Sequence, residues 1–261
     1  MASERQGDER PLGILCAMPE EMLLLSHAMH RPRTMTRAGA RFVSGRLEGH
    51  PVVLAESGIG KVAAALTATL LVERYRCRGL LFSGVAGGLD PALGIGDIVV
   101  ADRLIQHDYG AVIADRHVPF PAGAFPLGAP PSDVGFILDR ELRARLRAAL
   151  AGYVPPYLSG GVLGEAGGRQ PQLLFGTVVT GDTFVNSAAA RLHLHERWNA
   201  QAVEMEGAAV AQVATRFGVA CVVIRALSDL AGEESQMDFG RFLELAAAAA
   251  ADVVRRVVKV V

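Results

Sequence analysis

Carboxylates recur at the points where apolar runs of this chain end. Glu20 and Glu21 follow one run near the N-terminus, Glu204 and Glu206 follow a second, and Asp229 closes a third. Carboxyl groups drawn from separate segments can divide the roles of general acid and general base in a hydrolytic reaction. These residues are therefore the first candidates for catalysis, provided that the fold brings the ends of the runs together.

Each carboxylate taken alone also has a purely structural explanation. An acidic side chain in the first turn of a helix is stabilised by the helix dipole, which accounts for Glu21 or Glu206 without any chemistry. Ser228 and Asp229 can simply cap the turn that follows them. The catalytic interpretation consequently depends on the carboxylates meeting in one place.

The order of the expected elements predicts such a meeting. Short apolar runs alternate with Ala- and Leu-rich stretches of helical period, which is typical of a sheet covered by helices on both faces. The runs that we read as strands are 11–18, 51–58, 79–84, 96–105, 173–182, 200–205 and 220–229, and the expected helices are Glu20–His30, Lys61–Arg76, Leu138–Ala151, Ala188–Trp198, Glu206–Phe217 and Phe239–Val257. In an open parallel sheet the ligand crevice lies beyond the carboxyl ends of the strands, where the carboxylates stand.

We therefore expect a single α/β domain over 11–261, with a twisted, mixed and largely parallel β-sheet flanked by helices. A hairpin expected over 41–57 supplies antiparallel pairing. The polar residues 1–10 are expected to form a flexible tail. The stretch 115–171 is rich in proline and glycine, and we interpret it as an excursion from this domain because strand–helix units continue on both sides.

Common cofactor motifs fit the chain poorly. Gly58, Gly60 and Lys61 resemble the start of a dinucleotide-binding turn, but the next strand ends in Ser83-Gly84 and offers no acidic residue for a ribose. The spacing before Lys61 does not match a phosphate-binding Walker loop either. The glycines are explained by a tight strand-to-helix turn, and we expect no cofactor.

Metal binding and serine-hydrolase chemistry are also poorly supported. The histidines are His27, His30, His50, His107, His117, His193 and His195, and no two of them have the spacing of a metal pair on one helix face except His27 and His30, which we read as solvated. The chain contains no G-x-S-x-G nucleophile elbow. We expect no metal site.

The net charge and the cysteine content limit which classes of partner and which cellular compartment we expect. The formal charge of −1 gives no broad basic footprint, so we expect no nucleic-acid partner. No apolar run is long enough for a membrane span or a signal-peptide core, so we expect no membrane partner. The three cysteines are far apart and odd in number, which favours a reducing, cytoplasmic location.

Several strings of the chain resemble a known family. CAMPEEM, ESGIGKVAAALTATLL, SGVAGGLDPALGIGDIVVAD, TGDTFVNS, QAVEMEGAAVAQVA and VIRALSDLAG are similar to the methylthioadenosine/S-adenosylhomocysteine nucleosidases, within the purine nucleoside phosphorylase superfamily. The similarity runs in order from Gly13 to Leu245 and leaves out most of 115–171. The resemblance implies a homodimer that acts in methionine salvage on a small nucleoside, without a cofactor or metal.

The implied reaction is hydrolysis of the bond between adenine and the sugar in methylthioadenosine, S-adenosylhomocysteine or 5′-deoxyadenosine. By resemblance, Asp229 is the general acid that protonates the purine, and a carboxyl in that role must be held partly out of water. Glu21 is the base that orients and deprotonates water. Glu206 binds the ribose hydroxyls, Met205 packs beneath the sugar, and Arg225 helps to position the water and the ribose.

The resemblance also assigns the rest of the pocket. Phe184 lies against the adenine face, the main chain of Val185 bonds the adenine edge, and Ser228 stands beside the acid. Gly87 is small enough for ligand to approach the backbone. The apolar socket for the 5′-group is assigned to Ile59, Met18 and Phe239. Each of these apolar residues is also explained by ordinary core packing.

One contrast separates hydrolysis from phosphorolysis. A phosphorylase must hold a phosphate dianion near the end of the first strand, whereas this chain places Glu20 and Glu21 there. Carboxylates repel phosphate and suit the activation of water.

Two departures from the family keep alternatives open. Val85-Ala86-Gly87-Gly88 stands where the family has Ser-Ala-Gly-Gly, and the excursion is longer than expected. The alternatives are a phosphorylase or hydrolase for another nucleoside with a bulky 5′-group, and a non-catalytic nucleoside-binding protein.

Overall fold

The computed structural model describes residues 10–124, 134–157 and 169–261. Its strands are β1 (Leu12–Cys16), β2 (His30–Arg37), β3 (Ala40–Leu47), β4 (His50–Glu56), β5 (Gly79–Gly88), β6 (Ile98–Gln106), β7 (Gly110–Ile113), β8 (Arg116–Pro119), β9 (Phe136–Ile137), β10 (Leu173–Thr180), β11 (Ala200–Glu204) and β12 (Ala220–Asp229). Its helices are α1 (Pro19–His27), α2 (Lys61–Glu73), α3 (Arg140–Ala149), α4 (Ala188–Trp198), α5 (Gly207–Phe217) and α6 (Ser235–Val257).

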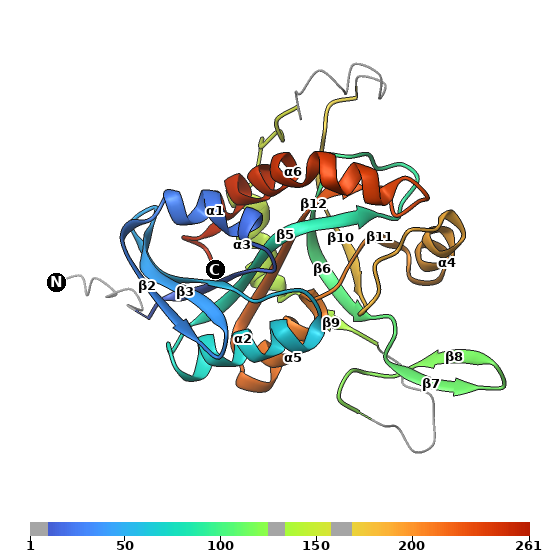
Figure 1. Cartoon of the computed structure of the whole chain (residues 1–261), viewed down its shortest axis with the longest axis horizontal. Helices are drawn as coiled ribbons and strands as arrows, with labels where there is room; N and C mark the ends of the chain where they lie inside the picture. Colours follow the sequence, from blue (N-terminus) through green and yellow to red (C-terminus); the bar gives the residue numbers. More distant parts are fainter. Residues whose placement is uncertain (1–9, 125–133, 158–168) are drawn as a thin grey trace.

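One mixed sheet forms the centre of the molecule, in the order β11-β10-β6-β12-β5-β1-β4-β3-β2 (Figure 1). Parallel pairs join β1 to β4 and β5, β5 to β12, and β10 to β6 and β11. An additional antiparallel pairing between β11 and β5 closes β5, β12, β6, β10 and β11 into a ring. This closure brings the end of β11 close to the ends of β5 and β12.

Helices cover both faces of the sheet, as the sequence predicted. Helices α1 and α6 lie on one face and α2 and α5 on the other, while α4 lies at the β11 end (Figure 1). Strands β1, β5 and β12 carry apolar residues on both faces because each strand contributes to both layers of core. The single α/β domain with a mixed sheet is therefore confirmed.

The element boundaries differ from the prediction in two informative places. The predicted helix Glu20–His30 ends at His27, and His30 begins strand β2. All eight residues of β2 are exposed, so this edge strand lacks the apolar alternation that would have revealed it. The last helix begins at Ser235, one turn before the predicted Phe239, and the predicted hairpin is present as β3 and β4.

The predicted excursion at 115–171 is only partly described. Within it lie β8, β9 and α3, and Asp139 caps α3 by accepting a hydrogen bond from the Leu142 amide at 2.8 Å. Residues 125–133 and 158–168, and all of the predicted tail except Arg10, lie outside the described residues. In the described part of the chain, no helix is long and apolar enough to cross a membrane.

Candidate active site

A pocket with about 500 Å³ of empty space lies at the carboxyl ends of the central strands. The last residues of β5, β11 and β12, and residues of the loops and helices that follow β1, β4, β10, β11 and β12, surround it. Its lining consists of Ala17, Met18, Glu21, Ile59, Val85, Ala86, Gly87, Phe184, Val203, Glu204, Met205, Glu206, Ser228, Asp229 and Phe239. The charged side chains in this lining are all carboxylates.

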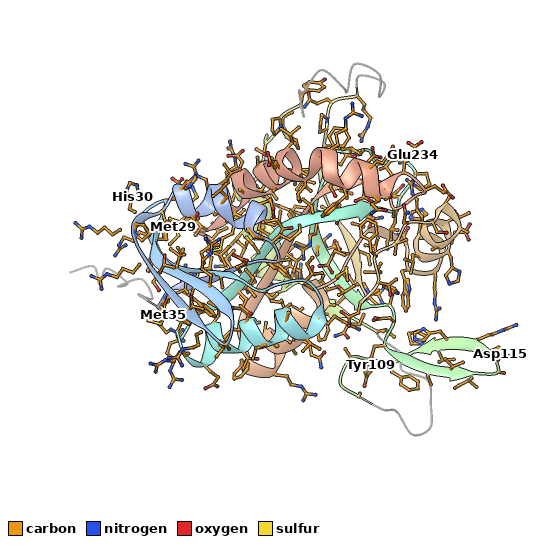
Figure 2. The ribbon with its side chains drawn as sticks, viewed as in Figure 1. Met29, His30, Met35, Tyr109, Asp115 and Glu234 are labelled. Atoms are coloured by element: carbon orange, nitrogen blue, oxygen red, sulfur yellow. The ribbon has the colours of Figure 1, made fainter. Side chains whose placement is uncertain are left out.

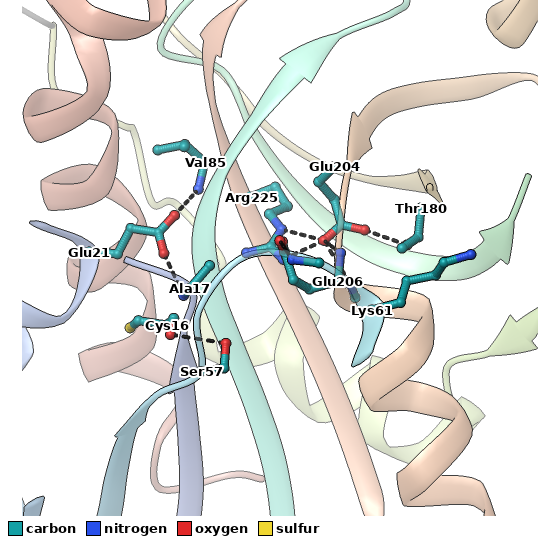
Figure 3. A network of polar contacts seen from close by, with 12 residues as sticks. Cys16, Ala17, Glu21, Ser57, Lys61, Val85, Thr180, Glu204, Glu206 and Arg225 are labelled. Carbon is teal, nitrogen blue, oxygen red and sulfur yellow. Dashed lines mark hydrogen bonds and ion pairs between the residues drawn. The ribbon is translucent and has the colours of Figure 1, made fainter. Parts of the chain in front are cut away.

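Glu21 is held by main-chain amides at the end of β1. Its Oε2 accepts a hydrogen bond from the Ala17 amide (2.7 Å), and its Oε1 accepts one from the Val85 amide (3.0 Å) (Figure 3). The Met18 amide also donates to Oε2, at 3.0 Å. Pro19 starts α1 at a position where its missing N–H is not needed, so Glu21 falls in the first turn. Burial raises the pKa of Glu21, while the Arg225 guanidinium and the three amides oppose that shift.

Arg225 lies fully buried in β12 and joins two glutamates. Its Nε donates to Glu204 at 3.2 Å, its Nη2 pairs with the same carboxylate, and Nη2 lies 3.5 Å from Oε2 of Glu206 (Figure 3). The guanidinium also lies over the Phe82 ring, 4.1 Å from its centroid. Among the described residues, no group accepts a hydrogen bond from Nη1 of Arg225. One nitrogen of the Arg225 guanidinium therefore remains to donate to a further acceptor.

Glu206 is positioned between this ion pair and the start of α2. Its Oε1 accepts a hydrogen bond from the Gly60 amide at 2.8 Å, and the residue is 5% exposed. Burial and the neighbouring Glu204 carboxylate raise the pKa of Glu206 to about 7, against the opposing effect of Arg225. Gly60 adopts a φ of 97°, a conformation that favours glycine, so the tight turn expected from the sequence is present.

Asp229 is oriented by its own strand end. Its Oδ1 accepts a hydrogen bond from the Ala231 amide, and its Oδ2 accepts one from the Ser228 hydroxyl, both at 2.9 Å. A register shift between Leu227 and Asp229 in the pairing with β5 precedes this turn, and Asp229 is only 2% exposed. The carboxyl group is thus largely removed from bulk water.

Two glycines of β5 bring these groups together. Arg225 lies opposite Gly84 in the sheet, and Asp229 lies opposite Gly87. A methyl group on Gly84 would overlap both Nη1 of Arg225 and Oε1 of Glu21, so those two atoms approach the same point. A methyl group on Gly87 would lie 3.0 Å from Oδ1 of Asp229. The glycines of β5 therefore leave the space in which Glu21, Arg225 and Asp229 pack against this strand.

Apolar side chains complete the pocket. The rings of Phe184 and Phe239 meet edge to face with centroids 6.0 Å apart. Ile59 and Phe184 are 58% and 47% exposed, so they stand at the open mouth, whereas Met18 and Met205 are half-buried. An apolar mouth above a polar floor suits a ligand with one flat or aliphatic part and one hydroxylated part.

Of the predicted site residues, ten line the pocket and two do not. Arg225 lies beneath the lining and reaches it through Glu206. The side chain of Val185 packs against the small core around Val203 and Leu194. The lining brings together Glu21, Asp229, Glu206, Met205, Phe184, Ser228, Ile59, Met18, Gly87 and Phe239.

Two residues beside the pocket had no assigned role: Glu204, which was a candidate only as a carboxylate at the end of a run, and Thr180, which was not predicted. Glu204 accepts hydrogen bonds from the amides of Glu206 (3.1 Å) and Gly207 (2.7 Å), in addition to pairing with Arg225. The Thr180 hydroxyl donates to Glu204 and accepts from the Ala208 amide. A glutamate at the end of an apolar strand was a signal for Glu204, but nothing in the sequence linked Thr180 to it. Within the described ranges, no cluster of three potential ligands that could hold a metal is present.

The raised pKa of Glu206 predicts that this residue lowers stability at neutral and alkaline pH. Because its folded pKa lies above its unfolded value, the folded state loses stability as the pH rises between the two values. Glu206→Gln removes the buried charge and retains an oxygen for the Gly60 amide. We expect a higher melting temperature for this variant at pH 8, by about 2–4 °C for each kcal/mol by which the free energy of unfolding increases. The gain at pH 5 should be smaller.

Thermal unfolding at both pH values measures this effect, and Glu20→Gln is the matched control because Glu20 is exposed. A melting temperature that falls equally at pH 5 and pH 8 in Glu206→Gln would contradict the predicted charge penalty.

The chain matches the family model of the phosphorylase superfamily over residues 11–259. It is 44% identical to a 5′-methylthioadenosine/S-adenosylhomocysteine nucleosidase of Mycobacterium bovis over 249 residues, covering 95% of this chain and 97% of the relative. The structure of a nucleosidase of the same name from Colwellia psychrerythraea, in complex with adenine, matches with a TM-score of 0.80 and 31% identity, covering 97% of this chain and 96% of that one. A futalosine hydrolase mutant of Helicobacter pylori matches with a TM-score of 0.79 and 32% identity, covering 97% and 100%.

Proposed function

Because the chain belongs to the phosphorylase superfamily, and within it to the 5′-methylthioadenosine/S-adenosylhomocysteine nucleosidases, we propose that it hydrolyses the N-glycosidic bond of 5′-substituted adenosines. It is an enzyme of the N-glycosyl hydrolase class, and its substrates are small nucleosides. Methylthioadenosine, S-adenosylhomocysteine and 5′-deoxyadenosine are the proposed substrates, and adenine is the common product. The convergence of Glu21, Glu206 and Asp229 on one pocket carries this proposal.

The departing base requires a proton, and Asp229 supplies it in this proposal. As the bond between N9 and the anomeric carbon breaks, its electron pair moves to the purine, and protonation at N7 by Asp229 neutralises the growing negative charge. The Ser228 hydroxyl and the Ala231 amide fix the carboxyl group, and its burial keeps water from competing for the proton.

The ribose and the attacking water are assigned to the other two carboxylates. Glu206 accepts hydrogen bonds from the ribose hydroxyls, and Arg225 and the Gly60 amide orient it. The water lies between Glu21 and the free Nη1 donor of Arg225, two groups that approach the same point beside Gly84. Its oxygen bonds to the anomeric carbon while Glu21 takes its proton, which leaves the free ribose with its 5-substituent unchanged as the second product.

The apolar residues are assigned to the two ends of the nucleoside. Phe184 lies against the purine and the main chain of Val185 bonds its edge, while Met205 packs against the sugar. Ile59, Met18 and Phe239 surround the 5′-substituent at the mouth, where 58% exposure of Ile59 leaves an apolar surface for a thioether.

Hydrolysis is favoured over phosphorolysis by the charge of the pocket. Its charged lining residues are carboxylates, and the buried Arg225 is already paired with Glu204 and Glu206. A phosphate dianion at the end of β1 would face the Glu21 carboxylate in a water-poor setting, where like charges repel strongly. Water, which is neutral, meets no such barrier.

The candidate substrates differ in the substituent at the 5′ position of the ribose. Val85 lines the pocket beside Glu21 with an apolar side chain, where the family resemblance leads one to expect a hydroxyl. A nucleoside with another bulky 5′-group is the second candidate, because a Helicobacter pylori futalosine hydrolase mutant has a similar fold.

Product analysis tests the function. Purified enzyme is incubated with each adenosine derivative and with futalosine, with and without phosphate, and both products are separated by chromatography. Free adenine and free sugar in equal amounts, at a rate independent of phosphate, support the proposal. Sugar 1-phosphate would assign a phosphorylase, and cleavage of futalosine alone would assign the second candidate.

We further propose that the enzyme is a cytoplasmic homodimer that acts in methionine salvage. Strands β7 and β8 form a two-stranded sheet of their own, and Tyr109 and Asp115 mark its base and its turn, away from the main body (Figure 2). Val112 is 75% exposed and Ile113 is 56% exposed on this hairpin. An isolated hairpin is only marginally stable in water, so a second copy that covers these side chains is the proposed partner.

Light scattering coupled to gel filtration tests the dimer. We expect the wild-type enzyme to elute with twice the mass of the chain and Ile113→Asp to shift toward the monomer, because a charge would be buried in the interface. A wild-type enzyme that is monomeric at all concentrations would contradict this proposal.

A further inference from the structure

Three charged residues beside the pocket form a closed ring of hydrogen bonds. The Lys61 ammonium donates to Oδ1 of Asp108 at 2.7 Å, and the Asp182 amide donates to Oδ2 of Asp108 at 3.0 Å. The Lys61 amide donates to Oδ1 of Asp182 at 2.8 Å, and the Lys61 ammonium lies 3.7 Å from Oδ2 of Asp182. Each residue therefore bonds both of the others.

The ring fastens together three segments that are remote in the sequence. Lys61 begins α2, Asp108 follows β6, and Asp182 follows β10. None of the three residues lines the pocket, but Ile59, two residues before Lys61, and Phe184, two residues after Asp182, both do. Gly60, which precedes Lys61, donates its amide to Glu206.

The Lys61 ammonium is the positive charge of the ring and contacts both of its carboxylates. The Lys61 side chain is 17% exposed, less than those of Asp108 (30%) and Asp182 (49%). Burial would raise the pKa of Asp108, but the bonds from Lys61 and from the Asp182 amide hold that pKa below its usual value. Without the ammonium, the carboxylate of Asp108, after β6, and that of Asp182, after β10, would lie close together with no cation between them.

The sequence adds an independent point. Only two of the 26 basic residues are lysines, Lys61 and Lys259. A compact ammonium on a flexible stem reaches two carboxylates from the first turn of a helix, whereas a planar guanidinium imposes a fork geometry. Lysine, a rare residue type in this chain, thus stands at a position where its shape suits contact with two carboxylates.

We propose that Lys61 is a positioning residue for nucleoside binding. It fixes the start of α2, so that the Gly60 amide orients the Glu206 carboxylate toward the ribose, and it holds the 181–184 loop, so that Phe184 meets the base. The inference rests on the proposed function of the pocket. It assigns Lys61 to the recognition of the nucleoside and leaves proton transfer to Asp229 and Glu21.

The kinetics of Lys61→Met with methylthioadenosine test this role. We expect KM to rise by about tenfold, because a hydrogen-bonding group that is no longer well oriented binds the substrate less tightly. We expect kcat to change by less than about threefold. Lys61→Arg, which keeps the charge, should show a smaller rise in KM. Asp108→Asn should raise KM as well, and the double variant should be less affected than the two single effects combined, because both act through one ring.

Lys259→Met is the matched control, since it removes the other lysine from an exposed position near the C-terminus. Circular dichroism and the melting temperature establish that each variant is folded. A folded Lys61→Met enzyme with an unchanged KM, or with kcat reduced and KM unchanged, would overturn the proposal while leaving the hydrolase function intact. Absence of adenine release by the wild-type enzyme would instead refute the proposed function itself.

Discussion

Asp229→Asn is expected to lower kcat for methylthioadenosine by about 10²–10⁴-fold, the usual contribution of a general acid. Asparagine has nearly the same shape, its oxygen can still accept from the Ala231 amide, and its amide can donate to the Ser228 hydroxyl. Folding and nucleoside binding should therefore persist, while the proton for the purine is lost. Steady-state kinetics and the melting temperature measure both effects.

A change of leaving group separates acid catalysis from general damage to the pocket. A thioribosyl substrate that releases p-nitrophenolate needs little protonation, so the deficit of Asp229→Asn should shrink greatly with it. Asp238→Asn is the matched control, because Asp238 lies in the first turn of α6 within electrostatic reach of Asp229 and does not line the pocket. Near-normal turnover of methylthioadenosine by Asp229→Asn would remove this residue from the acid role.

Glu21→Gln is expected to reduce kcat by a similar factor, about 10²–10⁴-fold, through loss of the base that activates water. Both carboxylate oxygens of Glu21 accept main-chain hydrogen bonds, so the amide group of glutamine will oppose one of these donors. We therefore also expect a loss of stability of about 1–3 kcal/mol. Adenine should still bind, because its proposed contacts lie around Phe184.

The pH profile adds an independent readout for Glu21. The base must be ionised, and burial raises its pKa, so the rate of the wild-type enzyme should fall on the acid side at a pH above the ordinary value for glutamate. Glu20→Gln, one residue away and exposed, should keep the wild-type rate and profile. An unchanged acid limb in the residual activity of Glu21→Gln would assign that limb to another group.

Much of the fold could be predicted because its buried central strands are visible in the sequence as apolar runs. The runs in β1, β5 and β12 are buried on both faces, and such runs are mostly apolar up to the strand ends, with Arg225 as the charged exception within β12. Strand β2 could not be found in this way, because it is exposed along its whole length at the edge of the sheet. Its pairing with β3 is a property of the assembled sheet.

The acidic part of the site could be predicted from the same pattern. Parallel strands deliver their carboxyl ends to one edge, so glutamates and aspartates at those ends were expected to meet, and Glu21, Glu206 and Asp229 do line one pocket. The hydrogen-bond and ion-pair partners of these carboxylates were harder to predict from the sequence. The pairing of Arg225 with Glu204 depends on the closure between β11 and β5, which no local pattern encodes.

The hydrogen-bonded ring of Lys61, Asp108 and Asp182 could not be predicted from local sequence patterns either. Its members are separated by 47, 74 and 121 positions along the chain, and each resembles an ordinary surface charge on its own. Only the sheet order, which places β10 beside β6, brings Asp182 to Asp108.

A crystal structure of the Asp229→Asn variant with methylthioadenosine tests the central claim most directly. We predict one nucleoside in the pocket, with the ribose hydroxyls within hydrogen-bond distance of Glu206 and N7 of the purine beside residue 229. An ordered water should lie between Glu21, Nη1 of Arg225 and the anomeric carbon. A nucleoside bound with its ribose away from Glu206, or with its anomeric carbon out of reach of any water on Glu21, would contradict the account.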